Sequence, residues 1–285
     1  MGSANAYAKL NLSLAVTGKR PDGYHTLASL VCFADITDRL SVTYADSLSL
    51  QVTGEFAALA GISEENLVLK AARLLRARAA IAQGASIVLE KNIPVGAGLG
   101  GGSADAAAAL KLLCAHWKLS LSSTELFSLA AELGADVPMC LYGKPCIAEG
   151  IGENITPLML PWQGWWVLLV FPNVPLATRD VFSRLGHPED TAPTHPEFTN
   201  DASVIGWLQK HPNRLQRAAI ALQPQVAEVL LALETLPNPP AISRMSGSGS
   251  ACYGLFAHES EAKSAAQFLA PRYPEWWVKS AAILI

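Results

Sequence analysis

A glycine-rich run is the segment of this sequence best suited to chemistry. It reads Pro94-Val95-Gly96-Ala97-Gly98-Leu99-Gly100-Gly101-Gly102-Ser103 and leads into an alanine-rich segment that we expect to be a helix capped by Ser103. The glycines leave consecutive backbone N–H groups open to a ligand. A helix start adds further N–H donors and the positive end of the helix dipole. The run therefore predicts a cradle for phosphate oxygens.

Several kinds of protein carry glycine-rich runs. A Walker loop requires a lysine after the last glycine, and none follows here. The spacing Gly96-x-Gly98-x-x-Gly101 matches the dinucleotide fingerprint, so an NAD-linked oxidoreductase stays an alternative. Pro94 argues against it, because that fingerprint begins directly after a strand. A plain surface loop is also open, but the context favours an ATP-dependent kinase without a Walker lysine.

Two polar residues near the N-terminus and one aspartate could serve such a kinase. Residues 6–16 alternate in polarity, which predicts a strand with one buried face and with Lys9 and Asn11 about 6–7 Å apart on the other. Asp136 follows the end of a predicted helix. An ionised aspartate can accept a proton from an alcohol, and a nearby lysine stabilises negative charge. From the residues alone, a surface carboxylate and a solvent-facing lysine are simpler interpretations.

The elements that position these residues mix strands and helices without strict alternation. This pattern predicts an α+β protein of two domains, 1–160 and 161–285, with a boundary near 158–162. We expect strands at 86–90, 165–171 and 276–285, a hairpin from 40–44 and 48–53, two short strands flanking 246–250, a loop at 186–200, and helices at 63–80, 103–119, 122–134, 202–210, 213–222, 224–236 and from 259 onward.

Bulk properties narrow the class of partner. The chain has 285 residues and a net charge of −3, so it lacks the basic field that holds nucleic acid. Its apolar runs are too short to cross a membrane. Five cysteines without C-x-x-C pairing fit a reducing, cytoplasmic compartment. We therefore expect a cytoplasmic protein with a small-molecule substrate, either a monomer or a homodimer.

Three segments together resemble the GHMP small-molecule kinases. They are Ala8–Leu12, the run Pro94–Ser103, and Met245-Ser246-Gly247-Ser248-Gly249-Ser250. The resemblance implies an N-terminal domain similar to domain 2 of ribosomal protein S5 and a ferredoxin-like C-terminal domain. It also implies the use of ATP and Mg²⁺.

Three further stretches narrow the resemblance. Thr17–His25, Gly134–Pro138 and Ala148–Glu153 are similar to the GHMP kinases that phosphorylate the 2-hydroxyl of a cytidine diphosphate-linked methylerythritol, in the non-mevalonate route to isoprenoid precursors. A GHMP kinase for another hydroxyl, or a catalytically dead metabolite-binding protein on the same scaffold, stays an alternative.

The resemblance also implies residue roles. Asp136 matches the catalytic base and Lys9 its partner. The predicted ATP-binding residues are Pro94, Gly96, Gly98, Leu99, Gly100, Gly101, Gly102 and Ser103, with Asn66 and Leu67 at the adenine. The predicted substrate-binding residues are Asn11, Tyr24, His25, Thr178 and Phe182. Ser103 is a candidate Mg²⁺ ligand.

The sequence departs from the family pattern at three places. Tyr7 replaces a common proline, and Val31 stands where a phenylalanine often stacks on the cytosine. Asn213-Arg214-Leu215-Gln216 replaces a typical Asn-Asp-Leu-Glu run, so contacts made by that segment are open.

Overall fold

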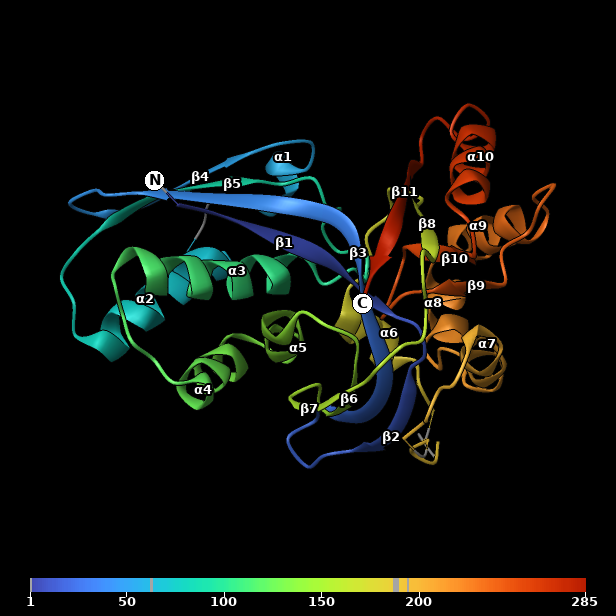
Figure 1. The fold of residues 1–285 in the computed structure, drawn as a ribbon, viewed down its shortest axis with the longest axis horizontal. Coiled ribbons are helices and arrows are strands. Elements are labelled where there is room, and N and C mark those ends of the chain that lie inside the picture. The colour runs from blue at the N-terminus through green and yellow to red at the C-terminus, as the bar shows by residue number, and fades with distance from the viewer. Residues whose placement is uncertain (1, 62–63, 187–189, 194) are drawn as a thin grey trace. The chain divides into compact units, whose positions relative to one another are not determined.

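The computed structural model describes residues 2–61, 64–186, 190–193 and 195–285 (Figure 1). The chain forms two compact units that are not consecutive in sequence. The first contains the residues up to Ala8, 36–95 and 100–143, and the second contains 9–35, 96–99 and 144–285. The chain passes from one unit to the other within β1 (Gly2–Asn11), within β3 (His25–Thr43), within the glycine-rich run, and between Gly143 and Lys144. The α+β class is confirmed, whereas the division near residue 160 stays a prediction.

The sheet of the first unit corrects the predicted hairpin. β4 (Leu48–Thr53) pairs in parallel with β5 (Ala85–Glu90), and β5 pairs antiparallel with β3 over Arg39–Thr43. β5 therefore lies between the two strands that we expected to pair. A parallel pair needs a crossover connection, and the segment between β4 and β5, whose described residues contain two helices, supplies it.

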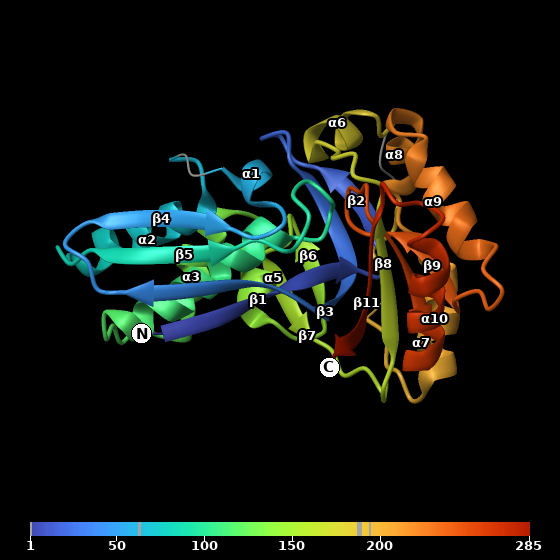
Figure 2. The same cartoon turned by 90° about the horizontal axis from the view of Figure 1, so that it is seen from above.

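Helices cover one face of this sheet, as α2 and α3 show in Figures 1 and 2. The helices of the first unit are α1 (Ala57–Ala60), α2 (Leu67–Ala79), α3 (Gly101–His116), α4 (Ser123–Leu133) and α5 (Val137–Tyr142). Ser122 forms the predicted capping box with Glu125. The helix predicted from residue 63 begins at Leu67, after the Asn66 cap, and Ser63 lies outside the described residues.

The predicted cap at Ser103 is wrong. Gly100 occupies the cap position of α3 with a φ of 64°, a left-handed conformation that glycine adopts without strain. The helix consequently begins at Gly101, and Ser103 lies in its first turn. This shift places three more N–H groups of the run at the start of a helix.

In the second unit, β8 (Trp166–Phe171) pairs antiparallel with both β10 and β11. Apart from the second-unit parts of β1 and β3, its other elements are β2 (Ala15–Lys19), β6 (Cys146–Gly150), β7 (Asn154–Pro157), α6 (Thr178–Ser183), α7 (Asp201–Lys210), α8 (Gln216–Leu222), α9 (Gln225–Glu234), β9 (Ile242–Met245), β10 (Cys252–Phe256), α10 (Glu259–Leu269) and β11 (Trp277–Leu284). Figure 2 shows the helices α7, α9 and α10 on one side of β8. Their buried apolar side chains form the core of this unit.

Two expectations from composition bear on this fold. All five cysteines are buried and free, as expected for a chain without a disulfide framework. Within the described residues, no helix has the length and apolarity needed to span a membrane.

Candidate active site

The first half of the glycine-rich run, Gly96–Leu99, is held by distant segments of the second unit. Backbone N–H groups of Leu176, Ala251 and Lys9 donate to three of its carbonyl oxygens at 2.9–3.1 Å. The hydroxyl of Ser246 donates to the fourth at 3.1 Å. Because protein groups engage all four carbonyl oxygens, this half can offer its N–H groups to a phosphate.

Gly98 shows how closely two glycine-rich segments approach each other. Its φ is 78°, and a Cβ built on it would lie 2.4 Å from the carbonyl oxygen of Ser246 and 2.8 Å from the nitrogen of Gly249. Only a residue without a side chain fits this position. The approach explains why both motifs contain glycine.

The second half of the run lies in the first unit and starts α3. Gly102 is exposed in the first turn, with the side chain of Leu67 3.7 Å from the position of a Cβ on it. Asn66 precedes Leu67 and caps α2, with its side-chain oxygen accepting from the N–H of Val68 at 2.9 Å. The structure therefore brings the predicted adenine residues to the start of α3.

Lys9 and Asn11 lie side by side at the end of β1. The ammonium of Lys9 donates to Oδ1 of Asn11 at 2.5 Å. The Asn11 amide donates to the hydroxyl of Ser29 at 2.7 Å, which in turn donates to the carbonyl oxygen of Ser13 at 2.6 Å. This chain of hydrogen bonds fixes the amide orientation of Asn11, and with it one partner of the ammonium.

The prediction of one buried face for residues 6–16 is wrong beyond Ala8. Lys9 is 3% exposed and Asn11 is 4% exposed, so both faces of the strand are covered there. Alternation of residue types could not reveal this, because polar residues that find partners can be buried too. The strand also ends at Asn11, and β2 begins only at Ala15.

The second glycine-rich segment, Ser246–Ser250, is anchored by residues 213–216, which depart from the family pattern. The buried amide of Asn213 donates to the carbonyl oxygens of Met245 and Gly247, both at 2.8 Å. Oε1 of Gln216 accepts from the N–H of Met245 at 3.0 Å. The contacts left open by the sequence are therefore neutral hydrogen bonds that hold this segment.

Ser246 connects this segment to both other motifs. Its hydroxyl accepts from the backbone N–H of Asn11 at 3.2 Å and donates to Gly98. Within the second unit, the hydrogen bonds thus join Lys9 and Asn11, the first half of the run, and Ser246–Ser250. These three segments are far apart in sequence and meet at one place.

Two of the predicted substrate-binding residues stack on each other. The rings of His25 and Phe182 have centroids 5.0 Å apart and an interplanar angle of 27°. Burial lowers the pKa of His25, and the nearby positive charge of Lys19 lowers it further. The imidazole is therefore neutral at pH 7, which leaves it one donor and one acceptor for a base edge.

The remaining substrate residues differ in their surroundings. Tyr24 is 59% exposed, so its ring is available to a ligand. The Thr178 hydroxyl lies 2.9 Å from that of Ser248, which ties the start of α6 to the second glycine-rich segment. Val31 is buried in β3, opposite Cys146 of β6, where it serves the packing of the sheet.

Asp136 precedes α5 in the first unit, directly after the Gly134-Ala135 connection that follows α4. It lies outside helix and strand, as predicted. Lys9 belongs to the second unit. Its pairing with Asp136 therefore stays a prediction.

Sequence reasoning missed several residues that support the site. The buried side chains of Arg244 and Tyr253 each donate to the carbonyl oxygen of Leu12 at 2.8 Å, just beyond Asn11. Ser29 supports the Asn11 amide. None of these residues belongs to a recognisable sequence motif, because the groups that they bind lie far away in the chain.

The part of the chain that the structure describes offers no metal site built from protein ligands alone. Among the described residues, no three His, Cys, Asp or Glu side chains gather to hold an ion. Magnesium in kinases binds mainly to nucleotide phosphates, waters and one or two protein oxygens. The half-buried hydroxyl of Ser103, in the first turn of α3, fits that smaller role.

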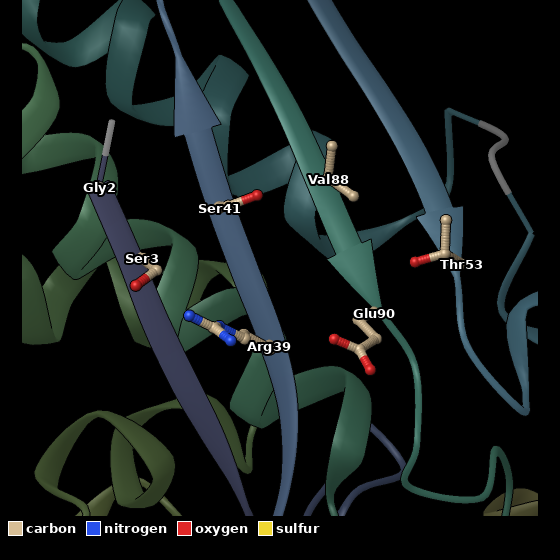
Figure 3. A pocket seen from close by; sticks show the side chains of 7 residues that line it. All are labelled: Gly2, Ser3, Arg39, Ser41, Thr53, Val88 and Glu90. Carbon is tan, nitrogen blue, oxygen red and sulfur yellow. The ribbon is translucent and has the colours of Figure 1, made fainter.

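A depression of about 420 Å³ lies on the outer face of the first unit's sheet, and Figure 3 shows the side chains that line it. It is lined by Gly2, Ser3, Arg39, Ser41, Thr53, Val88 and Glu90. None of these residues belongs to the predicted site. Strand alternation places Asp38 and Lys91, the chain neighbours of Arg39 and Glu90, on the opposite and buried face.

Comparisons with known proteins agree with this geometry. The family model of the GHMP kinase N-terminal domain matches residues 66–144, and that of the GHMP kinase C-terminal domain matches residues 201–275. A 4-diphosphocytidyl-2-C-methyl-D-erythritol kinase of Parvibaculum lavamentivorans is 45% identical, over 97% of this chain and 96% of that protein. One from Cereibacter sphaeroides is 44% identical over 99% of both chains.

Solved structures of kinases are also similar to this chain. A crystal structure of 4-(cytidine 5'-diphospho)-2C-methyl-D-erythritol kinase is 35% identical, with a TM-score of 0.79 over 99% of both chains. The homoserine kinase of Cytophaga hutchinsonii shares the fold at 18% identity, with a TM-score of 0.70 over 98% of this chain and 93% of its own.

Proposed function

This chain belongs to the family of 4-diphosphocytidyl-2-C-methyl-D-erythritol kinases within the GHMP kinases, and from that premise we propose how its residues carry out the reaction. It is an ATP-dependent kinase of that cytidyl compound, in the non-mevalonate route to isoprenoid precursors. The acceptor in our proposal is the 2-hydroxyl of the substrate. We expect a cytoplasmic enzyme, monomeric or dimeric, without nucleic-acid or membrane partners.

The glycine-rich run binds the phosphates of ATP through its backbone N–H groups and the start of α3. Asn66 and Leu67 lie at the adenine. The Ser103 hydroxyl would hold a Mg²⁺ ion bound together with ATP, and that ion would supply positive charge to neutralise the phosphates. The engaged carbonyl oxygens of Gly96–Leu99 support this assignment, because they orient the run toward an anion.

Asp136 accepts the proton of the acceptor hydroxyl. At the same time the hydroxyl oxygen forms a bond to the γ-phosphorus of ATP, and the bond between that phosphorus and the leaving ADP breaks. The Lys9 ammonium stabilises the negative charge that develops on the transferred group. Asn11 holds this ammonium by its side-chain oxygen, which limits its rotation. The lysine is thus oriented before the substrate binds.

His25, Phe182 and Tyr24 hold the cytosine, and Asn11 and Thr178 contact the rest of the substrate. The stacked pair of His25 and Phe182 supports this specificity over that of other GHMP kinases. The observation that carries the proposal is the hydrogen-bond network joining Lys9 and Asn11, Gly96–Leu99 and Ser246–Ser250.

ADP release by the purified protein tests the proposal. Mg-ATP would be supplied with 4-diphosphocytidyl-2-C-methyl-D-erythritol, and with mevalonate, homoserine and galactose in parallel. We expect turnover with the cytidyl compound alone. Turnover with another alcohol instead would contradict the roles of His25 and Phe182. Tight binding of NAD without ATP turnover would contradict the kinase assignment.

A further inference from the structure

Three buried charged side chains of the first unit lie beside the glycine-rich run and have no part in the reaction described above. Asp38 lies in β3, Lys91 directly follows β5, and Asp105 lies in α3, one turn after Gly101. None is more than 2% exposed. Burial of charged groups is costly unless they are paired and hydrogen-bonded, so their partners are informative.

Asp38 and Lys91 fix the backbone that directly precedes the glycine-rich run. The Lys91 ammonium donates to Oδ2 of Asp38 and, at 2.7 Å, to Oδ2 of Asp105. Oδ1 of Asp38 accepts from the backbone N–H groups of Asn92 at 2.5 Å and Ile93 at 2.8 Å. Ile93 directly precedes Pro94, so one carboxylate fixes the backbone just before the run begins.

The same ammonium lies against the exit from the run. A Cβ built on Gly101, the first residue of α3, would be 2.9 Å from Nζ of Lys91. Asp105 then ties the next turn of that helix to the ammonium. The backbone of Lys91 is itself fixed, since its N–H donates to Thr53 at 2.7 Å and its carbonyl oxygen accepts from Phe56 at 2.9 Å. One side chain therefore joins the two ends of the run.

The charges of this cluster indicate a geometric role. Burial alone would lower the pKa of Lys91, but Asp105 and Asp38 raise it, so the ammonium stays charged. Two carboxyl groups surround this single cation. The cluster adds no net positive charge for binding an anion, and what it supplies is the position of the run.

We propose that Lys91, Asp38 and Asp105 are positioning residues that fix both ends of the glycine-rich run and thereby preorganise it for the phosphates of ATP. The proposal rests on the proposed function of the run. A loop that is already ordered loses less conformational freedom when its ligand binds. Disrupting the cluster should therefore weaken ATP binding and leave the acceptor site and the chemical step little changed.

The test compares two substitutions of Asp105 in the full-length protein. Binding of the non-hydrolysable analogue AMP-PNP with Mg²⁺ would be measured by calorimetry, and kcat and both KM values by ADP release. Asp105→Leu removes the oxygen, Oδ2, that accepts from Lys91, and we expect Kd to rise about tenfold. We expect kcat at saturating ATP, and KM for the cytidyl substrate, to stay within about twofold. Asp105→Asn keeps an accepting oxygen, so Kd should stay within about threefold.

Two further variants complete the design. Lys91→Met should raise Kd by about thirtyfold, because both ties are lost. It leaves two buried carboxylates without their cation and can fail to fold, so the Asp105 pair decides the test. Lys111→Met removes an exposed lysine of the same helix and should match the wild type.

The outcomes are distinct. An Asp105→Leu protein with a lowered melting temperature but unchanged Kd would reduce the cluster to a stabilising role and overturn the proposal. Equal losses of affinity in Asp105→Leu and Asp105→Asn would also overturn it. If the wild type bound no AMP-PNP, the proposed function of the run itself would fail, and the proposal with it.

Discussion

The two halves of the glycine-rich run are held by different chemistry. Gly96–Leu99 is held by neutral groups of the second unit, mostly backbone N–H groups. Gly100–Ser103 starts a helix beside the buried ammonium of Lys91 and its two carboxylates. A contact between two backbones cannot yield without moving the chain, whereas the end of a lysine side chain can shift. The first half should therefore tolerate less change than the second.

Among the changes that test this difference between the two halves, an added methyl group in each half should have the largest effect. In Gly98→Ala the new Cβ would meet the backbone carbonyl oxygen of Ser246, 2.4 Å away, at a left-handed φ. In Gly101→Ala it would meet the Lys91 ammonium at 2.9 Å. We expect kcat/KM for ATP to fall about 100-fold for the first, roughly 3 kcal/mol, and about tenfold for the second. Equal losses, or a larger loss for Gly101→Ala, would contradict the proposed difference between the two halves of the run.

The next effect tests whether the second unit's network depends on neutral partners. Asn213→Asp would place a carboxylate against the carbonyl oxygens of Met245 and Gly247, in place of an amide donor. We expect a loss of about 3 kcal/mol in the free energy of unfolding, measured by urea denaturation. Arg214→Gln is the matched control. Arg214 is about half exposed and lies 3.6 Å from Asp190, so its loss should stay within about 0.5 kcal/mol.

The smallest expected effect is the change in KM for the cytidyl substrate when His25 becomes protonated. Burial and then Lys19 lower the pKa of His25 from its ordinary 6.5. KM for the cytidyl substrate should stay constant from pH 8 down to about 6.5 and rise by about threefold below it. Lys19→Met removes the second cause and should move this rise to higher pH.

The lowered pKa of His25 also makes the stability of the fold depend on pH. The unfolded chain takes up the His25 proton at higher pH than the folded protein does, so the free energy of unfolding should fall as the pH drops below 6.5. A KM that rises toward alkaline pH, or one that is unaffected by Lys19→Met, would contradict this account of His25.

Local signals in the sequence predicted much of the fold. The capping box of Ser122 and Glu125 is present, and α7 and α9 lie within two residues of their predicted bounds. The pairing of strands was not predictable in the same way. The pattern at 40–53 identifies two strands, but only the later segment 85–90 decides that they do not pair.

The candidate site shows the same limit. The glycines of the run are recognisable in the sequence, because a backbone that is approached closely by a ligand or by another backbone requires glycine. Lys91, Asp38 and Asp105 carried no such signal, since a charged residue in a sequence looks exposed until its partners, 14 to 53 positions away, are known. In the sequence Asn213 belongs only to a departure from the family pattern, and its contacts to Met245 and Gly247 depend on the fold.

Asp136→Asn tests directly whether Asp136 is the base of the reaction. The amide keeps the size of the carboxylate but cannot take the proton of the acceptor hydroxyl. We predict that release of ADP with 4-diphosphocytidyl-2-C-methyl-D-erythritol falls by about 10³-fold or more, while Kd for AMP-PNP changes by less than about threefold. A variant that turns over at the wild-type rate would remove Asp136 from the mechanism.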